Sequence, residues 1–291
     1  GYSAQVYARG LRAPDGLAVD AQGRLLVVEE GSGQITRFDG PGQAHVLVRG
    51  LRSPEGLCLG PDGDLFVVED IPGGRLLRID QQGKLEVLAT DLCAPEGVVF
   101  LEGRLFLTES TAQQESNKFA LRTRVLELTR GDQGWGPPVR RTDQGIPFSF
   151  AELLCLGDTH LIICNELASV LIPVGLLSFD LESGQLQPFA RGLIAPEGLC
   201  WTPRSAENED PGFPLYVAEE DVDGAGHGRI SRVTAEGKRS TFAAGFGTLE
   251  DVLVLADGRV FVSEDSTGSI VLLTPPPEAA DLTRKPAEKD D

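Results

Sequence analysis

The sequence predicts an all-β protein, a six-bladed β-propeller of four-stranded blades. Three observations lead to this prediction. One unit recurs six times, each unit contains short β-patterned runs separated by Gly and Asp turns, and helical periodicity is essentially absent. The recurring turn and first strand read APDGLAV, SPEGLCL, APEGVVF, FAELLCL, APEGLCW and TLEDVLV, beginning at Ala13, Ser53, Ala94, Phe150, Ala195 and Thr248.

The remaining strands of the unit and the chain ends predict how the ring closes. Each unit has a second apolar strand (RLLVVEE in the first), a third alternating strand, and a fourth that leads into the next turn. The sixth unit lacks its fourth strand after Thr274, whereas Ala4–Leu11 matches that strand. The N-terminal strand is therefore expected to close the last blade and remove the open sheet edges. Residues 1–274 form a single propeller in this scheme, and 275–291 form a Pro-rich charged tail.

Charge and hydropathy exclude two classes of partner. The chain has 26 Lys and Arg against 44 Asp and Glu, for a net charge of −18. Nucleic-acid binding needs clustered positive charge, so no nucleic-acid partner is expected. Apolar runs are far shorter than the ~20 residues of a membrane span. We expect a soluble protein. No signal peptide is visible at Gly1, and removal of one, with a secreted or periplasmic location, stays open.

The acidic residue of each turn starts an innermost strand, so six acids are predicted to border the central channel at one end. This first ring consists of Asp15, Glu55, Glu96, Glu152, Glu197 and Glu250. Like charges in a partly desolvated funnel repel, so either several carboxyls stay protonated or a cation neutralises them. Oxygen ligands without His or Cys favour Ca²⁺, with Mg²⁺ or Mn²⁺ as alternatives. The competing interpretation, turn chemistry alone, would admit Asn or Ser equally well.

The end of each second strand returns to the same end of the propeller, 14 residues after the first-ring acid in blades one, two and six. The second ring there consists of Glu29, Glu69, Glu109, Asn165, Glu219 and Glu264. One residue further on, the third ring consists of Glu30, Asp70, Ser110, Glu166, Glu220 and Asp265. For both rings a structural role is favoured, because a carboxylate at a strand end often accepts backbone N–H groups from the next turn.

The turn P-[DE]-G-L with the following strand G-x-L-x-V-x-E resembles the repeat shared by NHL-type propellers, the gluconolactonase/senescence-marker-protein family and streptogramin lyases. Blades one and two match over their full length. In gluconolactonase-like hydrolases, this resemblance implies one divalent cation on the axis, held by Glu, Asn and Asp. The matching first ring here has Glu and Asp but no Asn. Streptogramin lyases use a catalytic His at the strand-one position, where all six residues here are acidic.

The favoured function is that of a metal-dependent lactonase or esterase, in which the cation polarises a carbonyl and an unligated channel Glu activates water. The candidate bases are Glu96, Glu197 and Glu250. Two alternatives stay open. One is a non-enzymatic module that binds cations or a basic ligand. The other is an amine-handling lyase or condensing enzyme, by similarity to strictosidine-synthase-like propellers.

Three further features are predicted at the channel mouth. Ser110–Thr123 is expected to form a long polar loop, with counter-charges supplied by Lys118, Arg122 and Arg124. Leu167–Gly175 is expected to form an apolar loop, which either binds the hydrophobic part of a substrate or packs on its neighbour. His227 is placed on this face too, either as a general base or as a solvated loop histidine.

Overall fold

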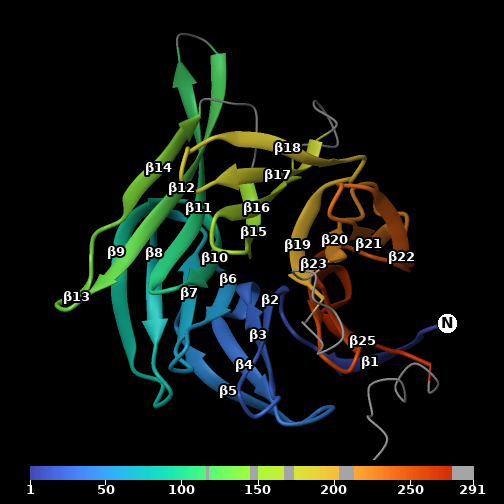
Figure 1. Ribbon diagram of the computed structural model, residues 1–291. Coiled ribbons are helices and arrows are strands. Elements are labelled where there is room, and N and C mark those ends of the chain that lie inside the picture. Colours follow the sequence, from blue (N-terminus) through green and yellow to red (C-terminus); the bar gives the residue numbers. More distant parts are fainter. Residues whose placement is uncertain (116–117, 145–149, 167–173, 203–212, 277–291) are drawn as a thin grey trace, which may run out of the picture.

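A computed structural model of the chain describes residues 1–115, 118–144, 150–166, 174–202 and 213–276. Six antiparallel sheets stand around a central axis (Figure 1). Each sheet has four strands, and blade three carries one additional short strand. The predicted all-β, six-bladed propeller is therefore confirmed. No helix in the described ranges is long and apolar enough to span a membrane.

The strands of each blade follow one another from the axis outward. Blades one to three consist of β2 (Pro14–Val19), β3 (Leu25–Glu29), β4 (Gln34–Phe38) and β5 (Ala44–Arg49); β6 (Pro54–Leu59), β7 (Leu65–Glu69), β8 (Pro72–Ile79) and β9 (Leu85–Cys93); and β10 (Pro95–Leu101), β11 (Arg104–Glu115), β12 (Lys118–Gly131) and β14 (Val139–Gln144), with β13 (Gly134–Trp135) beside β12. Blades four to six consist of β15 (Phe150–Leu156), β16 (His160–Asn165), β17 (Val174–Asp180) and β18 (Leu186–Arg191); β19 (Pro196–Trp201), β20 (Leu215–Glu219), β21 (Gly228–Val233) and β22 (Arg239–Phe246); and β23 (Leu249–Val254), β24 (Val260–Glu264), β25 (Ser269–Thr274) and β1 (Ser3–Arg9).

The second strand of a blade is apolar on both faces because a neighbouring blade covers each face. All five residues of β3, β7 and β20 are buried. Six hydrophobic clusters lie between the blades, one for each pair of neighbours. In the cluster between blades one and two, Val28 and Val67 are fully buried. The core is thus a ring of six interfaces that surrounds the channel.

Closure of the ring joins the two ends of the described chain. Strand β1 pairs antiparallel with β25, from Ser3 opposite Thr274 to Arg9 opposite Ser269. At the axis, β2 packs beside both β6 and β23. The N-terminal strand therefore completes blade six, as the missing fourth strand predicted. This closure pairs a sheet edge that would otherwise be open to another chain.

A β-bulge at the first-ring acid interrupts the innermost strand of every blade. In blade one, Pro14 pairs with Glu29 and Leu17 pairs with Val27. Two residues of β2 between these pairs therefore lie opposite one residue of β3. The same shift occurs in the other five blades. A bulge bends its strand and redirects the side chain of the extra residue. The repeated bulge therefore sets the direction of the acid independently of the strand's alternation.

Blade three differs from the expectation of a mouth loop at Ser110–Thr123. Strands β11 and β12 continue through this segment and stay paired as far as Glu115 opposite Lys118, so the loop prediction is wrong. The result is a long hairpin that projects beyond the blade (Figure 1). Of the predicted apolar loop Leu167–Gly175, residues 167–173 lie outside the described part of the chain, and Val174 and Gly175 begin β17.

The glycine that follows the acid allows neighbouring innermost strands to lie close together. A Cβ atom on Gly198 would lie 2.5 Å from the Cα of Asp251 and 2.6 Å from the carbonyl oxygen of Glu250. We predict that Gly198→Ala lowers the free energy of unfolding by about 1–3 kcal/mol, because the backbones must separate. Chemical denaturation of the original protein and of the variant measures this difference in the free energy of unfolding. The control is Gly131→Ala, whose Cβ would meet nothing nearer than 3.9 Å. Equal stability of the two variants would contradict the prediction.

Candidate metal centre

The channel mouth contains a cavity of about 230 Å³ whose described lining consists entirely of carboxylates. The lining residues are Asp15, Glu55, Asp70, Glu96, Glu166, Glu197, Glu220 and Glu250. Five of these belong to the first ring. The sixth predicted member, Glu152, lies on β15, and its side chain is outside the described part of the structure. Strand pairing places Ala151 in register with Asp15 and Glu152 in register with Gly16, so the predicted register is wrong by one residue in blade four. The bulges thus bring together acids that are far apart in sequence.

Three lining residues come from the third ring: Asp70, Glu166 and Glu220. Sequence reasoning favoured a turn role for this ring, whereas the structure places these three carboxylates on the cavity wall. A backbone hydrogen bond fixes the position of two of them. The N–H of Asp70 donates to the carbonyl of Ser53 (2.8 Å), and that of Glu220 to Ala195 (3.0 Å). The end of strand two is thereby tied to the turn that precedes the first-ring acid.

Those turns are conformationally strained. Ala13, Ser53, Ala94 and Ala195 each stand two residues before a first-ring acid, and they adopt φ values of 46°, 39°, 43° and 37°. A side chain with a Cβ atom is disfavoured there by roughly 1–2 kcal/mol. Such strain persists only when the surrounding contacts over-determine the backbone, and it concentrates at functional sites. In the sequence, an Ala-Pro or Ser-Pro step gives no sign of a positive φ.

Burial and mutual repulsion shift the protonation of the lining acids. Burial, followed by the nearby carboxylates of Asp251 and Glu30, raises the pKa of Asp15 to about 8. Burial and the charge of Asp15 raise the pKa of Glu250 to about 9. Burial, followed by the charges of neighbouring carboxylates, raises the pKa values of a further set well above their ordinary range: Glu55, Glu96 and Glu197. The funnel therefore holds protons at neutral pH in the absence of another cation.

Asp70 is a lining acid whose carboxylate lacks a full set of donors. Burial raises its pKa, and Glu55 is among the neighbouring groups that influence it. Its Oδ1 is buried and has no hydrogen-bond partner in the described part of the structure. A buried carboxylate oxygen without a donor is stabilised by uptake of a proton or by contact with a cation.

The second-ring residues lie outside the described lining of the cavity, and their carboxylates have hydrogen-bond partners elsewhere. Glu69 is fully buried and is held by Arg75 (Nη2 to Oε1, 2.6 Å) and Arg52 (Nη2 to Oε2, 2.9 Å). Although burial opposes the shift, hydrogen bonds from these arginines lower the pKa of Glu69. Arg229 also forms an ion pair with Glu219 (Nη2 to Oε2, 2.6 Å). In blades two and five the second-ring acid therefore lies next to a compensating guanidinium.

A backbone contact recurs throughout the second ring. A carboxylate oxygen of Glu29, Glu69, Glu109, Glu219 and Glu264 accepts the N–H of, respectively, Arg12 (3.1 Å), Arg52 (2.9 Å), Cys93 (2.8 Å), Ile194 (2.6 Å) and Gly247 (2.7 Å). Asn165 instead donates from Nδ2 to the carbonyl of Val174 (3.0 Å). In blades one, two, three, five and six the second-ring acid thus ties the second strand to the segment that enters its blade.

The geometry of one side of the funnel suits a calcium ion. Glu166, Glu197 and Glu220 each offer a carboxylate oxygen, and these three oxygens lie within 4.8 Å of one another. Oxygens on one Ca²⁺ stand 2.3–2.6 Å from the ion and hence within about 5 Å of each other. The donor set is oxygen only, as hard cations require. The residues present therefore fit a divalent cation of this kind.

Asp251 is a half-buried acid that the sequence reasoning did not single out. It occupies the position where the first blade has Gly16, and its carboxylate accepts the N–H of Leu17 (Oδ2, 2.8 Å) and of Val252 (Oδ1, 2.7 Å). Burial, partly offset by these bonds, raises its pKa to about 7. The side chain thus links blade six to blade one. An acid in a position that holds glycine in blades one, two, three and five was the signal available in the sequence.

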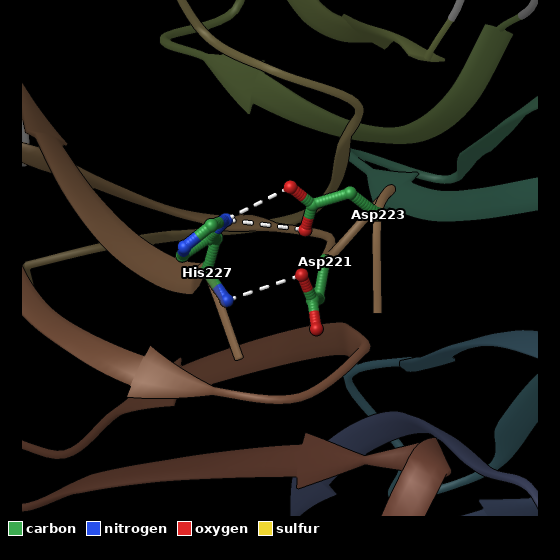
Figure 2. Close-up of side chains that lie close together, drawn as sticks. All are labelled: Asp221, Asp223 and His227. Atoms are coloured by element: carbon green, nitrogen blue, oxygen red, sulfur yellow. Dashed lines mark hydrogen bonds and ion pairs between the residues drawn. The ribbon is translucent and has the colours of Figure 1, made fainter. Parts of the chain in front are cut away.

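His227 lies in a loop of blade five with two acids, outside the funnel lining (Figure 2). Its Nδ1 lies 3.0 Å from Oδ2 of Asp223, and both side chains are exposed. Asp221 accepts the backbone N–H groups of Ala225, Gly226 and His227, which hold its pKa below the usual value although burial opposes the shift. Asp221 therefore organises the loop, and Asp223 pairs with the histidine. Neither nitrogen of His227 is placed in the funnel.

Fold and site together define a six-bladed propeller with a cavity at one end of its channel, and the described lining of this cavity consists of carboxylates. No family model matches the sequence, and no curated protein matches it. Solved structures do share the fold. A gluconolactonase from Xanthomonas campestris matches with a TM-score of 0.72 at 15% identity, over 94% of this chain and 90% of that chain.

Two further structures extend the comparison. A putative gluconolactonase has a TM-score of 0.68 at 14% identity, over 94% of this chain and 92% of that chain. A virginiamycin B lyase from Staphylococcus aureus has a TM-score of 0.59 at 14% identity, over 94% of this chain and 99% of that chain. The propeller architecture that the repeat resemblance implied is therefore confirmed. Likeness at such low identity concerns the fold and not the chemistry.

The raised pKa values predict how stability depends on pH. A carboxyl whose pKa is higher in the folded state binds more protons there, so stability is lost as pH rises from the unfolded value near 4 through the folded value. For Asp15 and Glu250 the folded values are about 8 and about 9. We predict that the melting temperature of chelator-treated protein falls by at least about 5 °C between pH 6 and pH 9.

Matched variants test the source of this dependence. Asp15→Asn removes one of the titrating groups, so the slope of melting temperature against pH should become shallower. Asp132→Asn, at an exposed turn, should leave the slope unchanged. A slope that is flat in the original protein, or identical in both variants, would show that the funnel acids do not titrate in this range.

Proposed function

We propose that the funnel binds a divalent cation, Ca²⁺ in the first place, and that the protein is a metal-dependent hydrolase of lactones or esters. The observation that carries the proposal is the cavity itself. Its described lining holds eight carboxylates and no basic side chain. Desolvated like charges are costly unless protons or a cation balance them. The lactone class is supported by the gluconolactonase structures that share the fold.

The lining residues divide into two roles in this proposal. Glu166, Glu197 and Glu220 hold the cation, because their oxygens converge. Glu96 and Glu250 both lie close enough to Glu197 to raise its pKa, so they flank the convergent group. The bound ion would supply electrophilic polarisation of the substrate carbonyl. Of the three acids predicted as bases, this assigns Glu197 to cation binding and leaves Glu96 and Glu250 to orient and deprotonate the attacking water.

A second candidate function is a binding module without catalysis. It is favoured by the uniformity of the described lining, which offers carboxylates of one kind and no other reactive side chain. Such a cavity would bind a metal ion or an organic cation through charge alone. The two candidates share the cation site and differ in whether a bound lactone is hydrolysed.

Cation binding is tested by calorimetry and thermal unfolding on chelator-treated protein. Saturating Ca²⁺ should raise the melting temperature, since a ligand at a hundred times its Kd stabilises by about 2.7 kcal/mol. Glu197→Gln should weaken binding at least tenfold because it removes a convergent charge. Glu86→Gln, on the outer strand β9, is the control with unchanged affinity. Absence of heat and of a melting shift with Ca²⁺, Mg²⁺ and Mn²⁺ would exclude the metal centre.

Catalysis is tested on the Ca²⁺-loaded protein with a panel of lactones and aryl esters. Glu96→Gln or Glu250→Gln should lower kcat by about 10²–10⁴-fold while calcium affinity changes little, because the lost group transfers a proton. Hydrolysis is followed by titration of the released acid. Calcium binding without turnover of any member of the panel would favour the binding module instead.

A further inference from the structure

A second, smaller cavity of about 100 Å³ adjoins the funnel on blade five. It shares the wall residue Glu220 with the funnel, so the two spaces meet at that side chain. Two aliphatic residues line it, Ile194 before β19 and Val222 in the loop between β20 and β21. They are 39% and 61% exposed. A single exposed aliphatic side chain is ordinary, but two that line one cavity beside a polar site form a local apolar surface.

The charged residues of this cavity are already paired with one another. Arg229 donates to Glu219 from Nε (2.9 Å) and from Nη2 (2.6 Å). His227 faces Asp223 at 3.0 Å. Within the described lining, the side chains that remain for a ligand are therefore the two aliphatic ones, together with Glu220 at the funnel boundary. Such a surface suits an uncharged apolar group, since a ligand hydroxyl placed there would lose hydrogen bonds to water without replacement.

The repeat shows that the aliphatic side chain is a feature of blade five. Ile194 occupies the position whose backbone N–H binds the second-ring carboxylate. In blades one, two, three and six that position is Arg12, Arg52, Cys93 and Gly247. The structural contact is made by the backbone alone, so it places no demand on the side chain. Among the described blades with this contact, Ile194 is therefore the branched aliphatic side chain, beside arginine, cysteine and glycine.

We infer that blade five carries an apolar subsite, formed by Ile194 and Val222, that binds a short alkyl chain of the lactone or ester substrate. The inference rests on the proposed function for the identity of the polar end of that substrate, which lies in the funnel. It assigns a substrate class: lactones with an unbranched aliphatic substituent are preferred over polyhydroxylated sugar lactones. Ile194 and Val222 are specificity-determining residues in this assignment.

The test uses the calcium-loaded full chain and a series of γ-lactones with alkyl substituents of increasing length, beside glucono-δ-lactone. Affinity is measured by ligand-observed NMR and hydrolysis by titration of released acid, so that binding is read without turnover. Each methylene that enters the subsite should lower Kd and KM about twofold, because partial burial yields less than the full gain for a buried methylene.

Val222→Asn and Ile194→Asn should each remove most of this dependence on chain length. Val139→Asn on β14 is the matched control, since Val139 is 57% exposed and lies outside the described lining of both cavities. Circular dichroism and melting confirm that the exposed substitutions leave the fold intact.

The possible outcomes separate the subsite from the proposed hydrolysis. Hydrolysis with no dependence on chain length, or a dependence that survives both blade-five substitutions, overturns the subsite alone. Chain-length-dependent binding that the substitutions abolish, without any hydrolysis, supports the subsite and overturns the hydrolase. Failure of every lactone to bind the calcium-loaded protein overturns both.

Discussion

Repulsion among eight carboxylates in one cavity is the constraint around which this propeller is organised. The arginines of the second ring do not relieve it, because Arg52, Arg75 and Arg229 bind the second-ring acids Glu69 and Glu219. The funnel acids are held in place by apolar packing between all six pairs of blades and by closure of the ring. Apolar packing between the blades thus holds the funnel carboxylates close together against their mutual electrostatic repulsion.

The first-ring and second-ring acids of a blade have different roles in forming the funnel. The bulge turns the first-ring acid toward the channel, while the second-ring acid at the end of strand two accepts a backbone N–H and anchors the blade. Since the backbone makes these anchoring contacts, neighbouring side chains can vary from blade to blade. Blade-specific chemistry then arises where the repeat departs from its pattern, as at Asp251, which links blades six and one, and at Ile194, at the mouth of blade five.

The shared fold with gluconolactonases and virginiamycin B lyase does not by itself decide what the channel does, because propellers host unrelated chemistries on one scaffold. The composition of the mouth is the discriminating feature. A cavity lined in its described part by carboxylates is suited to positive charge, and the converging oxygens of Glu166, Glu197 and Glu220 suit a hard cation. Ile194 and Val222 line a smaller cavity beside the funnel and offer an apolar surface to an organic ligand.

The repeat by itself determined the number of blades, the closing strand and the end of the molecule at which the first-ring acids gather, because each of these follows from period, strand order and strand direction. Only the tertiary structure decided which acids face one another. Asp70, Glu166 and Glu220 line the cavity, whereas Glu69 and Glu219 one residue earlier are bound by arginines. It also showed that Ser110–Thr123 continues as paired strands. Bulges, positive φ angles and contacts between blades set these directions, and they arise from packing between segments that are distant in sequence.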